Sequence, residues 1–388
     1  MAGAGAVTAA VGASAYTTLR DDATGTASSP EAGGTTTTAP GSTTTSALTD
    51  ATPQPVATEA TEVVEWVMPT SWPTSLPVLW GNCELFAERV GELTGGGFRI
   101  TPQPAGAVAD PIGLLDVVEA GDFSVGSSAT YYYIGRSPVL AFGSALPFGL
   151  SARQHSAWLY YGGGLEILND YYARNFNMIQ FPAGNTGAQM GGWFTREVSS
   201  LQDLEGLRMR IPGLGGSVMA RLGVDVINLG AGEILQALST GEIDAAEFVG
   251  PFDDANLGLQ GGAPFYYYPG FWEPGASLDM MVNLDAWNAL PVGYQHAFRA
   301  AAFESQIRVT AEYDANNGQA LNDLLANGTE LRQFPDDLLQ AARAASAIVL
   351  DEIAAGDPEF AIILEEWRNF RRQVSRWFSL AQFSADSL

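Results

Sequence analysis

The sequence is short of three residue types that often build functional sites. It contains no lysine, one cysteine and two histidines. With a single cysteine, Cys83, the chain can form neither an internal disulfide nor a thiolate metal cluster. Cys83 lies in an apolar pattern of helical spacing, so we expect it to pack in the core. His155 and His296 are far apart in the sequence, which argues against a histidine-based metal site or catalytic triad.

Positive charge is also scarce. The 18 arginines face 43 acidic residues, which gives a formal net charge of -25. A chain this acidic repels phosphates, so we expect no binding to nucleic acid. An acidic surface without lysine suits a salty medium, where screening limits self-repulsion. Genome composition explains the replacement of lysine by arginine equally well, so the habitat stays open.

The first 61 residues differ in composition from the rest of the chain. Residues 1–16 are uncharged, small and apolar, like the hydrophobic part of a signal peptide, but no basic segment precedes them. They represent either a truncated twin-arginine signal or a disordered Ala-rich tail. Residues 17–61 are rich in Thr, Ser, Ala and Gly and are expected to form a disordered linker. The order of these segments predicts an exported, periplasmic protein. The body that follows contains no apolar run of about 20 residues and is not expected to span a membrane.

The body, from residue 62 onward, alternates between strand and helix patterns. The segments "EVVEWVMP", "FRITPQPAG" and "FSVGSSATYYY" read as strands separated by helical segments, which predicts a mainly parallel sheet covered by helices. A second set of strands includes "FNMIQFPA", "LRMRI" and "AAEFV". Long helical patterns cover 291–327, 336–355 and 358–380. We therefore predict an α/β protein with two lobes, a hinged cleft and a small ligand between the lobes.

An arginine pair stands in the stretch "LRMRIPGLGG". In a strand, Arg208 and Arg210 point to one face and Met209 points to the other. Arg208 comes earlier and is expected to face solvent. Arg210 is at the strand end, where α/β sheets bind ligands and where a guanidinium can hold a carboxylate by two hydrogen bonds. The alternative is that both arginines merely neutralise acidic neighbours at the surface.

Four more polar residues lie where the pattern otherwise has apolar or glycine residues. Gln189 begins an apolar strand, and Asn185 lies in the glycine-rich turn before it. Glu247 interrupts an apolar strand, and Glu273 lies between an aromatic pair and a Pro-Gly turn. A buried carboxylate needs a cation or hydrogen-bond donors. If these residues converge on one cleft with Arg210, they form a hard-cation site beside a carboxylate clamp. Each residue alone also has a structural explanation.

Four motifs together resemble a known family. They are "PAGNTGAQMGGWF", "LEGLRMRIPGLGG", "GEIDAAEFVGP" and "YYYPGFWEPGA". In this order they resemble the solute-binding subunits of tripartite ATP-independent periplasmic (TRAP) transporters, over roughly residues 62–380. The subgroup they resemble binds 2-oxo acids or lactate through a metal ion. The resemblance implies a periplasmic-binding-protein-like fold that closes on its ligand, partner permease subunits in the membrane, and no catalysis.

The resemblance also assigns roles to residues. Arg210 matches the family's carboxylate clamp. Gln189, Glu247 and Glu273 match its metal ligands, and Phe248 takes a place that is usually tryptophan. Phe248 keeps a backbone carbonyl for the metal but offers no indole N–H.

The remaining contacts are an aromatic lining residue and the ion. Tyr132 of "TYYYIG" matches the aromatic segment that lines the pocket, and Asn185 is a candidate substrate contact. The ion is calcium or sodium. Two glutamates and one solute carboxylate carry three negative charges, Arg210 offsets one, and only a divalent ion brings the sum to zero.

The family fold implies a division of the chain. Lobe I takes residues 62–187 with about 277–318, and lobe II takes 188–276 with about 319–350. Residues 351–388 are expected to form a C-terminal helical extension.

Two other interpretations remain open at this point. Carboxylates around a metal also fit a metal-dependent lyase or hydratase that acts on a small carboxylic acid. The long helix and the C-terminal helix, with Trp367, Phe370 and Trp377 at near-helical spacing, fit a homodimer interface or packing within one chain.

Overall fold

The computed structural model describes residues 63–381. The predicted signal-like segment and linker lie outside these residues, as does the end of the chain from residue 382. Among the described residues, no helix is both long and apolar enough to cross a membrane.

One group of strands comes from the first part of the body and from a later return of the chain. β1 pairs in parallel with β2, and β10 lies antiparallel between β3 and β4. A parallel bridge between Thr70 and Ser127 links the two sets. The strands are β1 (Val64–Pro69), β2 (Phe98–Gln103), β3 (Val125–Ser128), β4 (Met178–Asn185) and β10 (Ser277–Asn283). Four of these five strands run in one direction, as expected for a mainly parallel sheet, and β10 is the exception. β10 is antiparallel because it enters from the opposite side after the chain has built the second sheet.

The second group is a six-stranded sheet in the order β11-β9-β5-β8-β6-β7. β6 is parallel to both β7 and β8, whereas β5 is antiparallel to β8 and β9. The strands are β5 (Gly192–Phe194), β6 (Arg208–Arg210), β7 (Asp225–Ile227), β8 (Ala245–Ala246), β9 (Phe265–Tyr268) and β11 (Glu330–Gln333). This sheet is mixed because β5 carries the chain across from β4.

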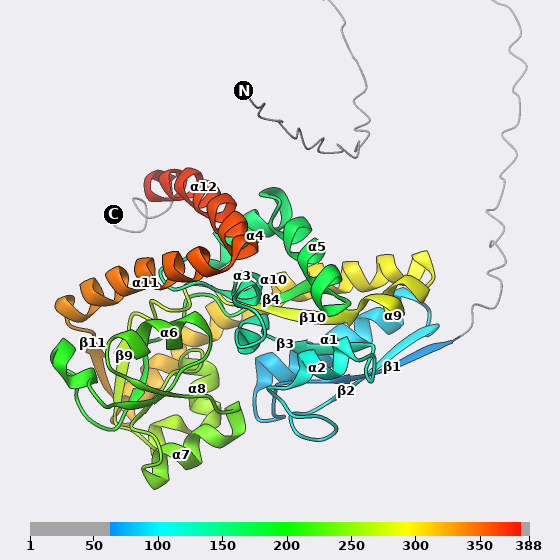
Figure 1. Ribbon diagram of the computed structural model, residues 1–388. Helices are drawn as coiled ribbons and strands as arrows, with labels where there is room; N and C mark the ends of the chain where they lie inside the picture. The colour runs from blue at the N-terminus through cyan, green and yellow to red at the C-terminus, as the bar shows by residue number, and fades with distance from the viewer. Residues whose placement is uncertain (1–62, 382–388) are drawn as a thin grey trace, which may run out of the picture. The chain divides into compact units, whose positions relative to one another are not determined.

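Helices surround both sheets (Figure 1). They are α1 (Pro77–Leu93), α2 (Leu114–Glu119), α3 (Ala141–Ser144), α4 (Ala152–Tyr161), α5 (Gly164–Phe176), α6 (Gly213–Arg221), α7 (Ile234–Thr240), α8 (Pro251–Leu257), α9 (Leu284–Ala289), α10 (Val292–Ala326), α11 (Asp336–Gly356) and α12 (Pro358–Ala381). The three long C-terminal helices agree closely with the predicted ranges. α10 also runs without a break through the Asn-Asn-Gly at 316–318.

α10 connects the two strand groups. It packs on α1 and β4 of the first group and on α8 beside the six-stranded sheet. Its apolar side inserts Phe298, which stacks edge-on against Phe86 with ring centroids 4.8 Å apart. Such contacts bury large apolar surfaces and fix the helix on the core. The predicted α/β architecture with a long helix across both halves is confirmed.

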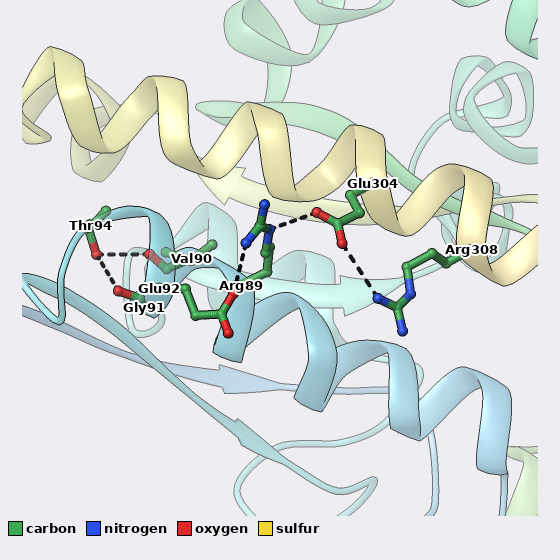
Figure 2. A network of polar contacts seen from close by, with 7 residues as sticks. All are labelled: Arg89, Val90, Gly91, Glu92, Thr94, Glu304 and Arg308. Atoms are coloured by element: carbon green, nitrogen blue, oxygen red, sulfur yellow. Dashed lines mark hydrogen bonds and ion pairs between the residues drawn. The ribbon is translucent and has the colours of Figure 1, made fainter.

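Partly exposed ion pairs accompany the contact between α1 and α10. Figure 2 shows Arg89 of α1 donating from Nε to Glu304 of α10 at 2.7 Å and from Nη1 to Glu92 at 2.8 Å. Arg308 reaches the other oxygen of Glu304 at 3.5 Å. These side chains are partly exposed, so water and salt screen them and packing contributes more to the contact.

Each sheet draws its strands from one of the predicted lobes. The proposed boundary at residue 351 falls inside α11, which continues to Gly356. We therefore propose that the C-terminal extension starts at Pro358, where the next helix begins, and keep the other boundaries as predicted.

A buried carboxyl group in β10 gives a stability prediction. Asp279 is 1% exposed and accepts a hydrogen bond from Gln180 Nε2 at 2.5 Å and weaker ones from Thr130 and Ser144 at 3.4 Å. Burial raises the pKa of Asp279 to about 7, although the hydrogen bond from Gln180 acts in the opposite direction. In the unfolded chain the pKa of an aspartate is about 3.9. Between these two pH values the folded protein holds a proton that the unfolded chain has lost, so this group makes stability fall as the pH rises.

Asp279→Asn keeps the shape and cannot ionise, so we expect it to remove this part of the pH dependence. Urea unfolding should show the variant more stable than the wild type at pH 8 by on the order of 1–3 kcal/mol, with a smaller difference at pH 5. Parallel stability curves for the two proteins from pH 5 to pH 8 would show that Asp279 is ionised throughout in the folded state.

Candidate functional site

The two arginines of β6 have different surroundings, although they share one side of the strand. Arg208 keeps 41% of its side chain exposed and binds both carboxylate oxygens of Asp244, at 2.8 and 3.0 Å. Arg210 is 1% exposed. Met209, between them, points into the core and is fully buried. Alternation places both arginines opposite Met209, and their position along the strand separates them, because Arg210 at the strand end is buried while Arg208 stays partly exposed.

Arg210 lies across the carboxyl ends of three neighbouring strands. Its Nε donates to the carbonyl of Leu229, after β7, at 3.1 Å. Its Nη1 donates to the carbonyl of Glu247, just after β8, at 2.7 Å, and also to Glu247 Oε1. Its guanidinium carbon is 5.7 Å from the ring centre of Phe248. Burial acts to lower the pKa of Arg210, but Glu247 together with Tyr132, Tyr131 and Glu273 outweighs it, so the pKa is raised. The guanidinium is therefore a permanent buried cation.

Glu247 is a buried carboxylate that is only half satisfied. It is 0% exposed, and among the described residues its Oε2 has no hydrogen-bond donor. Burial raises the pKa of Glu247 well above its usual range, and Glu273 adds to this effect while Arg210 opposes it. A buried carboxylate oxygen without a donor is costly unless a cation satisfies it.

Gln189 and Glu273 come from the two segments that cross between the sheets. The amide N–H of Gln189 donates to the carbonyl of Glu273 at 3.3 Å, and Gly270 donates to the carbonyl of Gln189 at 3.1 Å. The side-chain Nε2 of Gln189 donates to Thr186 Oγ1 at 3.0 Å. The other polar atom of this side chain, the buried Oε1 of Gln189, has no hydrogen-bond donor among the described residues. Burial raises the pKa of Glu273 to about 7, while Arg210 lowers it.

The tyrosines of the short 3-10 helix η1 (Thr130–Tyr133) adjoin this cluster. Tyr131 donates from its hydroxyl to Glu273 Oε2 at 3.2 Å. Its ring stands edge-on to that of Tyr132, with centroids 4.9 Å apart. Burial raises the pKa of Tyr132, and the charge of Arg210 opposes this. Sequence reasoning selected Tyr132 and missed Tyr131, because three adjacent tyrosines on a tight helix carry no pattern that says which of them faces the carboxylate.

Asn185 is buried, but its bonds serve the crossing segments. Its Nδ2 donates to the carbonyl of Gly275 at 3.2 Å, and its Oδ1 accepts from Gly187 at 2.9 Å. Thr310 of α10 donates to its backbone carbonyl at 3.3 Å. Within the described part of the chain, no hydrogen bond links it to Arg210 or the two glutamates, so a contact with the substrate stays a prediction.

The loop after β8 is fixed by a residue that the sequence did not single out. Asp254 accepts hydrogen bonds from the backbone N–H of Val249 at 3.1 Å, from Trp193 Nε1 at 2.9 Å and from the Tyr266 hydroxyl at 2.8 Å. These donors come from the loop itself, from β5 and from β9. Asp254 thereby holds the backbone on which Glu247 and Phe248 stand.

The chemistry of the cluster fits ligand binding. Four side chains predicted from separate segments, Gln189, Arg210, Glu247 and Glu273, are all buried at 6% exposure or less. Arg210 binds Glu247, and the backbone of Gln189 binds that of Glu273. The two pairs also lie close enough for Glu273 to affect the pKa of Glu247 and for Arg210 to affect the pKa of Glu273. No group of three or more His, Cys, Asp or Glu side chains in residues 63–381 has the arrangement of a metal site. A cation here would therefore need the amide oxygen of Gln189 and backbone or solute oxygens besides the two carboxylates, a donor set typical of calcium.

Cys83 and His155 are packed into the core away from this cluster, whereas His296 is exposed on α10. Cys83 is fully buried and donates to Ser127 Oγ at 3.3 Å, and burial raises its pKa to about 12. His155 is 3% exposed, its Nε2 lies 3.0 Å from the carbonyl of Phe142, and burial lowers its pKa to about 4. The predicted packing of Cys83 in the core is confirmed.

Comparison with known proteins places the chain in a family. Residues 70–357 match the family model described as bacterial extracellular solute-binding protein, family 7. A monocarboxylate 2-oxoacid-binding periplasmic protein of Nostoc sp. is 52% identical over 324 residues, which cover 84% of this chain and 88% of that protein.

Two solved structures are also similar. A TRAP transporter solute-binding protein from Bordetella bronchiseptica, a mixed-occupancy dimer with copurified calcium and picolinate, is 42% identical with a TM-score of 0.83, over 84% of this chain and 97% of that one. A TRAP periplasmic solute-binding protein from Colwellia psychrerythraea with bound calcium and pyruvate is 34% identical with a TM-score of 0.81, over 84% of this chain and 100% of that one. The lyase or hydratase alternative is therefore set aside. The chain belongs to the family 7 bacterial extracellular solute-binding proteins and is a periplasmic solute-binding subunit of a TRAP transporter, not an enzyme.

Proposed function

We propose that this protein captures a small 2-oxo or 2-hydroxy monocarboxylate, of the pyruvate, 2-oxobutyrate or lactate type, together with a metal ion, and delivers it to the TRAP permease subunits. The observation that carries the proposal is the pair of buried oxygens, Glu247 Oε2 and Gln189 Oε1, that have no hydrogen-bond partner within residues 63–381, together with the buried guanidinium of Arg210. The oxygens suit a hard cation and the guanidinium suits a carboxylate.

The residues present fit a bound ion. Gln189, Glu247, Glu273 and the backbone carbonyl of Phe248 would hold it. The ion would supply a positive charge that neutralises the carboxylates and holds oxygen atoms of the solute. Arg210 would orient the solute by its carboxylate, and Tyr132 would line the pocket with an aromatic surface.

Charge balance favours calcium over sodium. Glu247, Glu273 and the solute contribute three negative charges, and Arg210 offsets one of them. A divalent ion brings the sum to zero, whereas a monovalent ion leaves one excess negative charge in a buried place, where such a charge is costly. Among the similar proteins, that from Colwellia psychrerythraea has calcium with pyruvate, and one from Pseudoalteromonas atlantica, 34% identical, has sodium with pyruvate.

We also propose that the chain forms a homodimer through α10 and α12. Both helices expose large apolar side chains: Phe303 is 53% and Ile307 71% exposed on α10, and Trp377 is 63% and Leu380 69% exposed on α12. Burying such side chains against a second copy stabilises an assembly. The Bordetella bronchiseptica relative is described as a mixed-occupancy dimer, which supports a dimeric state.

Native mass spectrometry of protein purified without added ligand tests these points together. We expect a mass that exceeds the chains by one metal ion and one small carboxylic acid per subunit, and a subunit count of two. Dialysis against a chelator should remove ion and acid together, and calcium with pyruvate should restore the mass shift. If dialysed protein gave no calorimetric heat with pyruvate or lactate in either the presence or the absence of calcium, the proposed ligand class would be wrong.

A further inference from the structure

A hollow adjoins the segments that carry two of the proposed metal ligands, Gln189 and Glu273. It has a volume of about 290 Å³. Its lining includes the buried Gln189 and Gly270, and Pro274, which directly follows Glu273. Its solvent side, called its mouth below, carries the exposed Arg343 of α11 and the half-buried Arg371 of α12. The lining contains two arginines and no carboxylate, although the chain as a whole has a net charge of -25.

The two arginines at the mouth are held without a carboxylate partner. Arg371 donates from Nη2 to the carbonyl of Phe148 at 2.6 Å, and its guanidinium lies 5.5 Å from the ring centre of Trp367. The guanidinium of Arg343 lies 4.4 Å from the ring centre of Phe148. Among the described residues, neither forms an ion pair, whereas Arg368 beside them binds Asp351 at 2.8 Å. Carbonyls and aromatic rings orient these cations without neutralising them.

The positive charge continues along α12. A neighbouring hollow of about 370 Å³ is lined by Arg368, Arg371, Arg372 and Ser375, so Arg371 belongs to both. Burial lowers the pKa of Arg371, and the charges of Arg343 and Arg368 lower it further. These neighbouring arginines therefore create a local positive potential on the surface of an otherwise acidic protein.

Phe148 connects the mouth of the hollow to the segment that carries Glu273. Phe148 adopts a left-handed backbone conformation with φ 53°, which is strained for an aromatic residue. Its N–H donates to the carbonyl of Phe271 at 2.6 Å, and its ring stacks on that of Phe271 with centroids 4.7 Å apart. Phe271 is two residues before Glu273. A strained backbone conformation is kept only where contacts with neighbouring residues hold it in place. Phe148 therefore has a fixed position, and it connects Arg343 and Arg371, which contact it, to the segment that carries Glu273.

We propose that this hollow, with Arg343 and Arg371 at its mouth, is an outer anion-binding subsite that attracts the carboxylate of the solute before it reaches Arg210. The inference rests on the proposed function for the identity of the solute as a small carboxylate. An acidic protein repels such an anion at long range, so a local unpaired positive field raises the association rate. The subsite adds little to the final complex, because the solute leaves it for the inner site.

Stopped-flow measurement of tryptophan fluorescence tests the subsite, with pyruvate added to the calcium-loaded protein. In Arg343→Gln/Arg371→Gln we expect the association rate constant to fall about 3- to 10-fold at an ionic strength of ~0.01 M, where the Debye length is about 30 Å. At ~1 M salt, with a Debye length of about 3 Å, the two proteins should associate at similar rates. The dissociation rate constant should not change. Arg371→Lys, which keeps the charge, should retain the wild-type association rate.

The matched control is Arg196→Gln/Arg299→Gln, which removes the same charge from arginines that have no ion pair among the described residues and that do not line this hollow. It should associate at nearly the wild-type rate. Equal association rates in the two double variants, or a loss that persists at ~1 M salt, would overturn the subsite while the proposed function stands. If calorimetry shows that the wild type binds no pyruvate with calcium, the proposed function and the subsite are both wrong.

Discussion

Replacing Arg210 by glutamine is expected to abolish solute binding and to destabilise the protein. The guanidinium is the buried cation that faces Glu247 and, in our proposal, the carboxylate of the solute. Removing one partner of a buried ion pair leaves an uncompensated charge and typically costs about 3–5 kcal/mol. Loss of a charge-assisted, two-bond clamp should also reduce the affinity for pyruvate by more than about 100-fold, since each hydrogen bond to a charged group contributes about 1.5–3 kcal/mol. Calorimetry in the presence of calcium measures the affinity, and thermal unfolding measures the stability.

A double variant separates these two effects. Arg210→Gln/Glu247→Gln removes both charges and keeps both shapes, so its melting temperature should return to near or above that of the wild type, because paired buried charges contribute little net stability. Its binding should remain absent. Arg210→Lys keeps the charge but not the planar fork, and we expect intermediate affinity. If the double variant bound pyruvate with wild-type affinity, Arg210 would not be part of the binding site.

Arg208→Gln is the matched control for Arg210. It changes the same residue type in the same strand, two positions earlier. Arg208 pairs with Asp244 at a partly exposed position, where a salt bridge contributes about 0–1 kcal/mol. We expect a small loss of stability and unchanged affinity for pyruvate.

The different fates of these two arginines show what the sequence could predict. Strand alternation placed both arginines on one face. The Pro-Gly sequence that ends β6 marked Arg210 as the residue at the strand end, which was enough to separate it from a solvent-facing Arg208. The long helices were also predictable, because their apolar spacing is sustained over many turns. Residues 189, 247 and 273 could be selected as buried polar residues in apolar stretches, and the resemblance to a family gave them a common site.

Contacts between distant segments could not be predicted in this way. β10 and β5 run antiparallel to their neighbours because the chain crosses between the two sheets, and a local pattern carries no record of such a crossing. Asp254 follows a Pro-Phe-Asp turn, where an acidic residue usually stabilises a helix start. Its partners, Trp193 and Tyr266, come from strands far away in the sequence. The hydrogen bond from Tyr131 to Glu273 was out of reach for the same reason, because it depends on where Glu273 lies. Tyr132 as the residue that lines the pocket stays a prediction.

Glu273→Gln is expected to destroy metal and solute binding without destabilising the ligand-free protein. Glu273 is 3% exposed and lies in a cluster with a second buried carboxylate, Glu247, whose pKa it helps to raise. In the absence of a cation, the two negative charges repel each other and both have lost water, so a neutral side chain of the same shape relieves a cost. When the cation is bound, the Glu273 carboxylate is one of its ligands, and the neutral amide of glutamine is a weaker ligand for it.

We therefore expect the melting temperature of chelator-treated Glu273→Gln to equal or exceed that of the wild type at pH 8. The rise in melting temperature that calcium and pyruvate give to the wild type should disappear, since stabilisation by a ligand requires binding to the folded state. Tyr131→Phe removes only the hydrogen bond to Glu273 and should keep a reduced version of that rise. Glu242→Gln, at an exposed position, controls for the change in net charge and should respond like the wild type. A ligand-free Glu273→Gln protein that melts well below the wild type would mean that Glu273 is held by its hydrogen bonds as a structural residue, and that the cation is bound elsewhere.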